Sequence, residues 1–108
     1  MHHLFILNPK SFRRAREMDS LISSIDSYFK SVNQDNYKLY ISRFPRDAIG
    51  AIRMFMAGIP EDSRVRVYAA GGDGILFDCL NGVVGFENAE LAIMPFGITN
   101  NFVRSFGE

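Results

Sequence analysis

The stretch Ala69–Leu76 (AAGGDGIL) lies between an apolar run that predicts a β-strand and an amphipathic run that predicts a helix. Three glycines fall within four of its residues, at Gly71, Gly72 and Gly74. Glycine has no Cβ and tolerates positive φ, so the backbone amides of such a turn can converge on an anion. The positive end of the helix dipole points to the same place. The stretch therefore predicts a phosphate-binding loop.

Asp73 is the charged residue of this loop. A carboxylate is repelled by neighbouring phosphates unless a divalent cation or a substrate hydroxyl lies between them. Asp73 thus indicates phosphoryl transfer rather than binding alone. The alternative is a structural turn in which Asp73 only caps the helix.

The composition is that of one small domain, with 108 residues and 47% hydrophobic content. Twelve basic and twelve acidic side chains cancel, so the chain as a whole is not drawn to nucleic acid and any anion binding must be local. The lone cysteine, Cys79, is predicted to be a buried helix residue, which indicates a reducing compartment and argues against a zinc framework.

The amino terminus carries only four strongly apolar residues, Leu4–Leu7. This run is too short for a signal peptide or a transmembrane segment. We therefore expect a cytoplasmic protein, with His2 and His3 forming a frayed, solvated terminus.

Four runs predict strands: Leu4–Leu7, Tyr37–Ser42, Arg64–Ala70 and Leu91–Pro95. Helical patterns follow each of them, the last being a short helix capped by Thr99 or Asn100 and ending at Phe106. This alternation predicts an α/β fold, a three-layer Rossmann-like parallel sheet with helices on both faces.

Several residues have predicted places on these helices. Ser11 is expected to cap the first helix, whose first turn carries Arg13, Arg14 and Arg16. These arginines are either solvated or placed beside an anion. Gly50, inside the second helix, predicts close backbone packing. In the third helix, Leu80 and Val84 are expected on the buried face and Asp78 on the surface.

Three polar segments follow strands of the predicted sheet: Asn8–Ser11, Ala70–Gly74 and Pro95–Thr99. Ligands of parallel α/β sheets bind beyond the carboxyl ends of the strands. The sequence therefore predicts that the three segments face one crevice.

Taken together, the motifs resemble a known family. Asn8-Pro9-Lys10-Ser11, Gly71–Gly74 and Pro95-Phe96-Gly97 with Asn100–Arg104 are similar in order and spacing to the amino-terminal half of the diacylglycerol kinase catalytic domain family. That family includes bacterial lipid kinases and sphingosine kinases and is related to NAD kinases. The resemblance covers essentially the whole chain.

The resemblance implies that residues 1–108 are the nucleotide-binding domain of a two-domain lipid kinase. Such an enzyme uses ATP and Mg²⁺ and transfers the γ-phosphoryl group to a lipid hydroxyl, with Asp73 orienting or deprotonating that hydroxyl. By position, the candidates for the nucleotide site are Asn8, Ser11, Gly71, Gly72, Asp73, Gly74, Gly97, Thr99 and Asn100.

The resemblance also assigns the lipid-binding and metal-linked residues to a carboxyl-terminal β-rich domain that is absent here. No residue of this chain is therefore assigned as a metal ligand, and the chain alone is expected to be inactive. Its expected partners are a nucleotide and a lipid, with no nucleic acid. Peripheral membrane contact is compatible with this assignment. The surface facing the absent domain is expected to be partly apolar and able to drive homo-oligomer formation.

The chain departs from the family pattern at Phe12, Ile75, Ile98 and Asn101. Ile75 and Ile98 replace threonine hydroxyls that can bind phosphate or metal-bound water. Each lost charge-assisted contact weakens binding by about 1.5–3 kcal/mol. A second hypothesis is therefore a degenerate, non-catalytic nucleotide- or anion-binding regulatory module. A third, an NAD kinase, shares the Gly-Gly-Asp-Gly loop but fits the other motifs less well.

Overall fold

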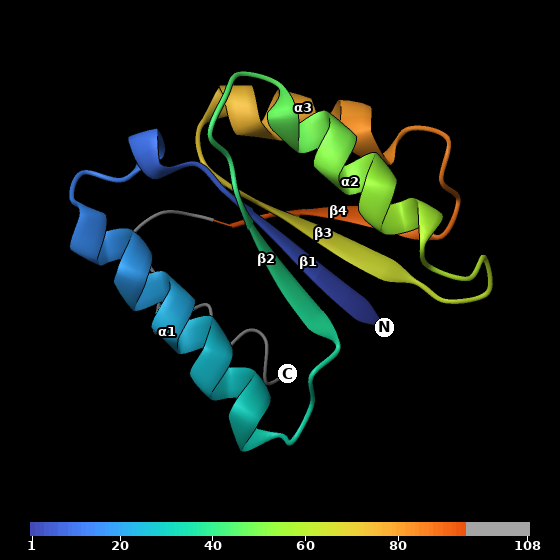
Figure 1. Cartoon of the computed structure of the whole chain (residues 1–108), viewed down its shortest axis with the longest axis horizontal. Helices are drawn as coiled ribbons and strands as arrows, with labels where there is room; N and C mark the ends of the chain where they lie inside the picture. The colour runs from blue at the N-terminus through green and yellow to red at the C-terminus, as the bar shows by residue number, and fades with distance from the viewer. Residues whose placement is uncertain (95–108) are drawn as a thin grey trace.

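The computed structural model describes residues 1–94 as a three-layer α/β fold (Figure 1). The elements are β1 (His2–Leu7), the 3₁₀ turn η1 (Pro9–Ser11), α1 (Ala15–Ser31), β2 (Tyr37–Ile41), α2 (Asp47–Ala57), β3 (Val65–Ala70), α3 (Asp73–Val83) and β4 (Ala89–Ile93). The four strands are parallel in the order β2-β1-β3-β4. The predicted fold class is confirmed. The predictions for Gly97, Thr99, Asn100 and the last helix lie outside the described residues.

A hydrophobic core lies on each face of the sheet, because β1 is buried on both sides. The core under α1 is built on Phe5, Leu7, Leu21, Ile25, Phe29, Tyr68, Ala70 and Met94. The core under α2 and α3 is built on Leu4, Ile6, Ala48, Ile52, Met56, Val65, Val67, Ala69, Ile75 and Cys79. Within the described residues, no helix has the length and apolar character needed to cross a bilayer.

The amino terminus is part of the sheet, so the expectation that His2 and His3 are frayed is wrong. Their amides donate hydrogen bonds to Arg64 O at 2.8 Å and Asn36 O at 3.0 Å. The His3 ring is buried, and a hydrogen bond of 2.8 Å joins its Nδ1 to the Tyr68 hydroxyl. Burial, helped by the positive charge of Arg66, lowers the pKa of His3 to about 4.

The close approach of α2 and α3 occurs at Gly82 and not at Gly50. A Cβ on Gly50 would meet nothing within 4 Å, whereas one on Gly82 would lie 2.8 Å from Ile52 Cδ1. The prediction for Gly50 is therefore wrong. Because Gly82 has no side chain, α3 packs closely on α2, with Ile75 and Cys79 on the buried face of α3. Leu80 and Val84 are therefore 48% and 62% exposed, so the prediction that they are buried is wrong.

Candidate functional site

The topological switch point of the sheet lies between β1 and β3. The connection that follows β1 leads to β2 at one edge of the sheet, and the connection that follows β3 leads to β4 at the opposite edge. Leu7 and Ala70, the last residues of these strands, pair in register. The amide of Asn8 then donates a hydrogen bond of 3.3 Å to Ala70 O. The structure thus brings the first and second predicted segments together at the position where ligands bind in such sheets.

Ser11 links the two loops. Its Oγ accepts a hydrogen bond of 3.3 Å from the Gly72 amide. The prediction that Ser11 caps the first helix is wrong, because α1 begins at Ala15 with Arg14 in the cap position. The reason is local: Pro9 opens η1, and Asn8 Oδ1 accepts a hydrogen bond from the Lys10 amide at 3.1 Å, which turns Ser11 toward the glycine loop.

The amino end of α3 presents unpaired donors. Gly72 occupies the cap position and supplies no side-chain hydrogen bond. The first backbone hydrogen bond of the helix runs from the Leu76 amide to Gly72 O at 3.2 Å. Among residues 1–94, the amides of Asp73, Gly74 and Ile75 have no acceptor. Open amides at a helix amino terminus, together with the helix dipole, favour an anion.

Of the three loop glycines, Gly71 is the one whose missing Cβ the packing requires. In residues 1–94 positive φ is found at one glycine, Gly85, which is elsewhere. At Gly72 and Gly74 a Cβ would meet nothing within 4 Å, so space is left above the loop. At Gly71 a Cβ would lie 2.8 Å from Ile75 Cβ, so this glycine is needed for internal packing.

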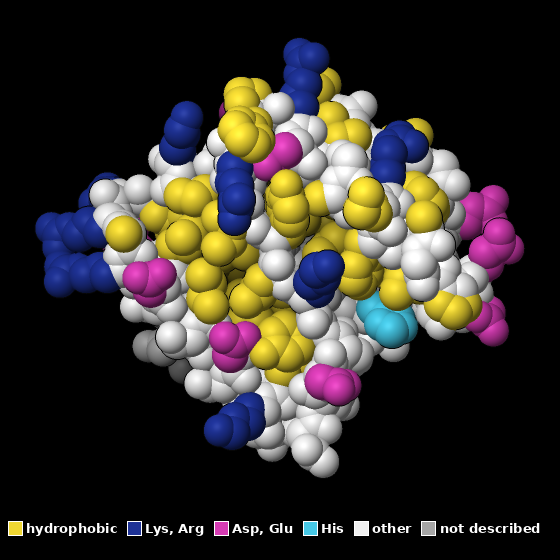
Figure 2. Space-filling view, viewed as in Figure 1, with side chains coloured by type: hydrophobic (Ala, Val, Ile, Leu, Met, Phe, Trp, Pro, Cys, Tyr) yellow, Lys and Arg dark blue, Asp and Glu magenta, His cyan; other side chains and the backbone are white. Residues whose placement is uncertain are grey.

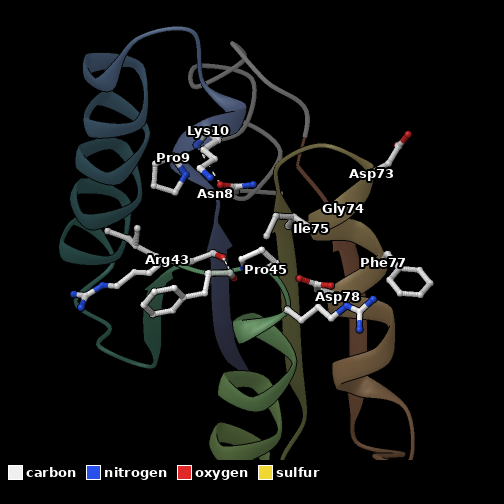
Figure 3. A pocket seen from close by; sticks show the side chains of 14 residues that line it. Asn8, Pro9, Lys10, Arg43, Pro45, Asp73, Gly74, Ile75, Phe77 and Asp78 are labelled. Atoms are coloured by element: carbon white, nitrogen blue, oxygen red, sulfur yellow. Dashed lines mark hydrogen bonds between the residues drawn. The ribbon is translucent and has the colours of Figure 1, made fainter.

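A pocket of about 910 Å³ opens beside this loop (Figure 3). It is lined by Asn8, Pro9, Lys10, Ile41, Ser42, Arg43, Phe44, Pro45, Arg46, Asp73, Gly74, Ile75, Phe77 and Asp78. One wall is the connection from β2 to α2, for which the sequence analysis predicts no site residue. No motif marks this wall, since it is defined by its place beyond the end of β2.

Asp47 holds that wall in one conformation. Its carboxylate accepts hydrogen bonds from the Tyr40 hydroxyl at 3.0 Å and the Ser42 hydroxyl at 2.6 Å. It also accepts from the amides of Arg43 at 2.8 Å and Phe44 at 3.2 Å. Burial acts to raise the pKa of Asp47, but the four hydrogen bonds outweigh burial and leave it below its usual value.

Asp73 lines the mouth of the pocket but is exposed. In Figure 3 its side chain points away from Asn8 and Lys10, which stand across the pocket. In the described part of the chain, its carboxylate makes no hydrogen bond or ion pair. The side chain is therefore available to a ligand only from the outer side of the loop.

Asp78 is a pocket residue that sequence reasoning missed. It is 8% exposed, so the prediction of a surface charge is wrong. No side chain or amide between residues 1 and 94 pairs with its carboxylate, and this residue lines the pocket. Asp78 lies three residues after Ile75 and four before Gly82, and this helical spacing places it on the buried face. The spacing from Ile75 is visible in the sequence, but the rotation of α3 that buries this face depends on the packing of Gly82 on Ile52.

The fold and site define a class of protein: a parallel α/β domain with a pocket at its switch point. The diacylglycerol kinase catalytic domain model matches residues 2–108, and the chain belongs to this family. No curated protein matches the chain.

Solved structures agree with this membership. A diacylglycerol kinase from Bacillus anthracis strain Sterne is 26% identical, with a TM-score of 0.64 over 98% of this chain and 38% of that one. A second structure from the same strain, also assigned as a diacylglycerol kinase, is 26% identical with a TM-score of 0.64 over 98% of this chain and 36% of its own. This chain therefore spans little more than a third of the length of these kinases.

Proposed function

We propose that the chain is the nucleotide-binding domain of a lipid kinase, which holds ATP and Mg²⁺ in the crevice and transfers the γ-phosphoryl group to a lipid hydroxyl. The observation that carries this proposal is the set of three open amides, of Asp73, Gly74 and Ile75, beside the space left by Gly72 and Gly74. Family membership supports the reaction. We assign the lipid site to a further domain, since this chain spans little more than a third of the kinases it resembles.

The residues of the crevice fit a nucleotide carrying Mg²⁺. The open amides suit phosphate oxygens, and Asn8 and Lys10 stand on the opposite wall. Mg²⁺ keeps several waters and takes one or two carboxylates together with substrate phosphates. Among the described residues, two carboxylates line the pocket: Asp78 is buried, whereas the side chain of Asp73 is exposed and points outward in Figure 3. Asp73 remains our candidate for orienting the acceptor hydroxyl, and Gly97, Thr99 and Asn100 remain candidates from the resemblance.

A second candidate function is nucleotide binding without transfer. Ile75 favours it, because this side chain replaces a hydroxyl donor and is 3% exposed within the core under α3. The outward direction of Asp73 also favours it (Figure 3).

Thermal unfolding with and without ATP and Mg²⁺ tests nucleotide binding, because a ligand of the folded state raises the melting temperature. Gly74→Ala would place a methyl group in the open space of the loop, and Gly50→Ala is the matched control in another helix. Both variants are expected to raise the free energy of unfolding by about 0.5–1 kcal/mol. Only Gly74→Ala should lose the response to ATP. An unresponsive parent protein, or equal responses in both variants, would contradict the proposal.

A further inference from the structure

β2 forms one edge of the sheet, and its outer side pairs with no strand of residues 1–94. Its contacts with β1 include hydrogen bonds from the His3 amide to Asn36 O at 3.0 Å and from the Ser42 amide to Leu7 O at 2.8 Å. Because backbone groups alternate in direction along a strand, the amides and carbonyls of residues 37, 39 and 41 face away from β1. This free edge is a template for one more strand.

A pocket of about 460 Å³ lies beside this edge, on the face of the sheet that α2 covers. We call it the edge groove. Its walls are Lys38 and Tyr40 of β2 and Gly50, Ala51, Met54 and Phe55 of α2. The helix packs on α3 through Ile52 and Gly82, and the edge groove lies on its other flank. Figure 2, seen from the same direction as Figure 1, shows hydrophobic side chains at the surface along β2 and α2.

Gly50 keeps part of the edge groove open. Glycine inside a helix costs about 1 kcal/mol relative to alanine, and a Cβ at this position would meet nothing within 4 Å. Met54, one turn later on the same flank of α2, is 80% exposed. Packing within residues 1–94 therefore accounts for neither residue, whereas the close approach of an external segment accounts for both.

The two charged residues that line the edge groove differ in availability. The Asp47 carboxylate accepts four hydrogen bonds, and the one from the Tyr40 hydroxyl, at 3.0 Å, fixes the Tyr40 ring in the wall. Lys38 is exposed and forms no ion pair with residues 1–94. The edge groove thus offers an apolar surface and an available cation beside free backbone groups.

We infer that the edge groove binds an extended peptide segment of a partner protein, which adds to β2 as a further strand and carries a carboxylate two residues from a large apolar side chain. Lys38 and Tyr40 are also two residues apart, so their side chains point to the same face of the sheet. The carboxylate of the added strand pairs with Lys38, and the apolar side chain enters the groove between Tyr40 and Met54.

Charge complementarity favours this occupant over a second copy of the chain. The β2 strand of a second copy, YKLYI, has no carboxylate to pair with Lys38 and would bring another lysine to the edge. An edge lysine is a common device against such self-pairing. The inference does not rest on the proposed function, since the open amides of α3 lie outside the edge groove.

The test is selection of random heptapeptides displayed on phage against the folded chain, with Gly50→Leu as the counter-selected variant. Leucine fills the edge groove and has a higher helix propensity than glycine, so this variant should fold. Selected peptides should carry Asp or Glu two residues from a large apolar residue, with no proline between them. In fluorescence anisotropy, a selected peptide should bind about 10-fold more weakly to Gly50→Leu and about 5-fold more weakly to Lys38→Glu.

The matched controls are Ala57→Leu, at an exposed position of α2, and Arg16→Glu, an exposed charge reversal on α1. Both should bind the selected peptide as the parent chain does. The same peptide with N-methylated amides keeps its side chains but loses the donors that a strand needs, so its binding should be lost.

Several outcomes would overturn the inference. These are no enrichment of any peptide, selected peptides without a carboxylate, equal losses in the groove and control variants, or equal binding of the N-methylated peptide. Concentration-dependent sedimentation that Gly50→Leu abolishes would assign the edge groove to a second copy of the chain instead. If Gly50→Leu fails a melting check for folding, Lys38→Glu takes its place in the counter-selection, and the N-methylated peptide decides whether a strand is added.

Discussion

The Ser11 hydroxyl and the Gly72 amide are joined by a hydrogen bond of 3.3 Å across 61 residues of sequence. This contact ties the loop after β1 to the loop after β3 at the switch point. It also occupies the Gly72 amide, so that the open donors are the next three amides of α3. The geometry of the candidate anion site therefore depends on a serine outside the glycine motif.

Ser11→Ala should weaken the response to ATP and Mg²⁺ more than it lowers stability. The Gly72 amide loses its acceptor but remains accessible to water, so we expect the free energy of unfolding to fall by about 0.5–1 kcal/mol. Calorimetric titration should show about 3- to 10-fold weaker binding, because the loop loses its anchor. Ser20→Ala, an exposed change on α1, is the control. Unchanged ATP affinity in Ser11→Ala would rule out this role.

Asp78→Asn should change stability little and reduce the response to Mg²⁺. Asp78 lines the pocket, and its carboxylate makes no hydrogen bond within residues 1–94, so the neutral isostere removes a charge without breaking a contact and should change the free energy of unfolding by at most about 0.5 kcal/mol. If this carboxylate helps to hold the cation, the effect of Mg²⁺ on ATP binding should fall in the variant. Asp73→Asn is the comparison, since its exposed side chain should leave stability unchanged. A destabilised Asp78→Asn protein would indicate a partner for the carboxylate instead.

Ile75→Thr tests whether the site has lost function. Threonine removes buried apolar surface, so we expect a loss of about 1–2 kcal/mol in stability. Ile75→Val is the matched control, because it also shortens the side chain but adds no hydroxyl. Tighter ATP binding by Ile75→Thr alone would support a decayed phosphate site. Tight binding by the parent protein with no gain in Ile75→Thr would argue against decay.

His3 should make the protein less stable in acid. Its pKa is about 4 in the folded state and near 6.5 when exposed, so between these values the unfolded chain binds more protons. Stability from this residue is fully present above pH 6.5 and is lost as the pH falls toward 4, by at most about 3 kcal/mol. Denaturant titrations at several pH values would measure this slope. His3→Gln should flatten it, whereas His2→Gln, at a less buried position, should not.

The parallel sheet could be predicted from the sequence, because each strand and helix has a strong local pattern. The continuous apolar run Leu4–Leu7 and the helical spacing of α1 indicate layers without any tertiary information. The sequence did not predict the features that depend on contacts between elements far apart in the chain. In the sequence, His3 has the character of a polar terminal residue, and its place in the sheet becomes evident only from its pairing with β2 and β3. Gly50 and Gly82 both lie within predicted helices, but only Gly82 lies close to a neighbouring helix.

The candidate site was also only partly accessible from sequence. The glycine loop and Asn8–Ser11 could be placed together because parallel strands share an orientation, and the structure joins them. The pocket wall formed by the β2–α2 loop could not be predicted from the sequence, because the four hydrogen bonds of Asp47 form only when this loop is folded. The position of Asp78 in the pocket could not be predicted either, because it depends on the rotation of α3 about its axis, which the packing of Gly82 on Ile52 determines.

The single thiol of the chain makes α3 directly observable. Cys79 is 0% exposed, and burial raises its pKa to about 12, so a thiol-specific reagent can react only when the surrounding structure opens. Cys79 lies on the same helix as the open amides and Asp78. The labelling rate of the unmodified protein would therefore report how firmly this helix is held, and how a bound ligand changes its opening, without any engineered probe.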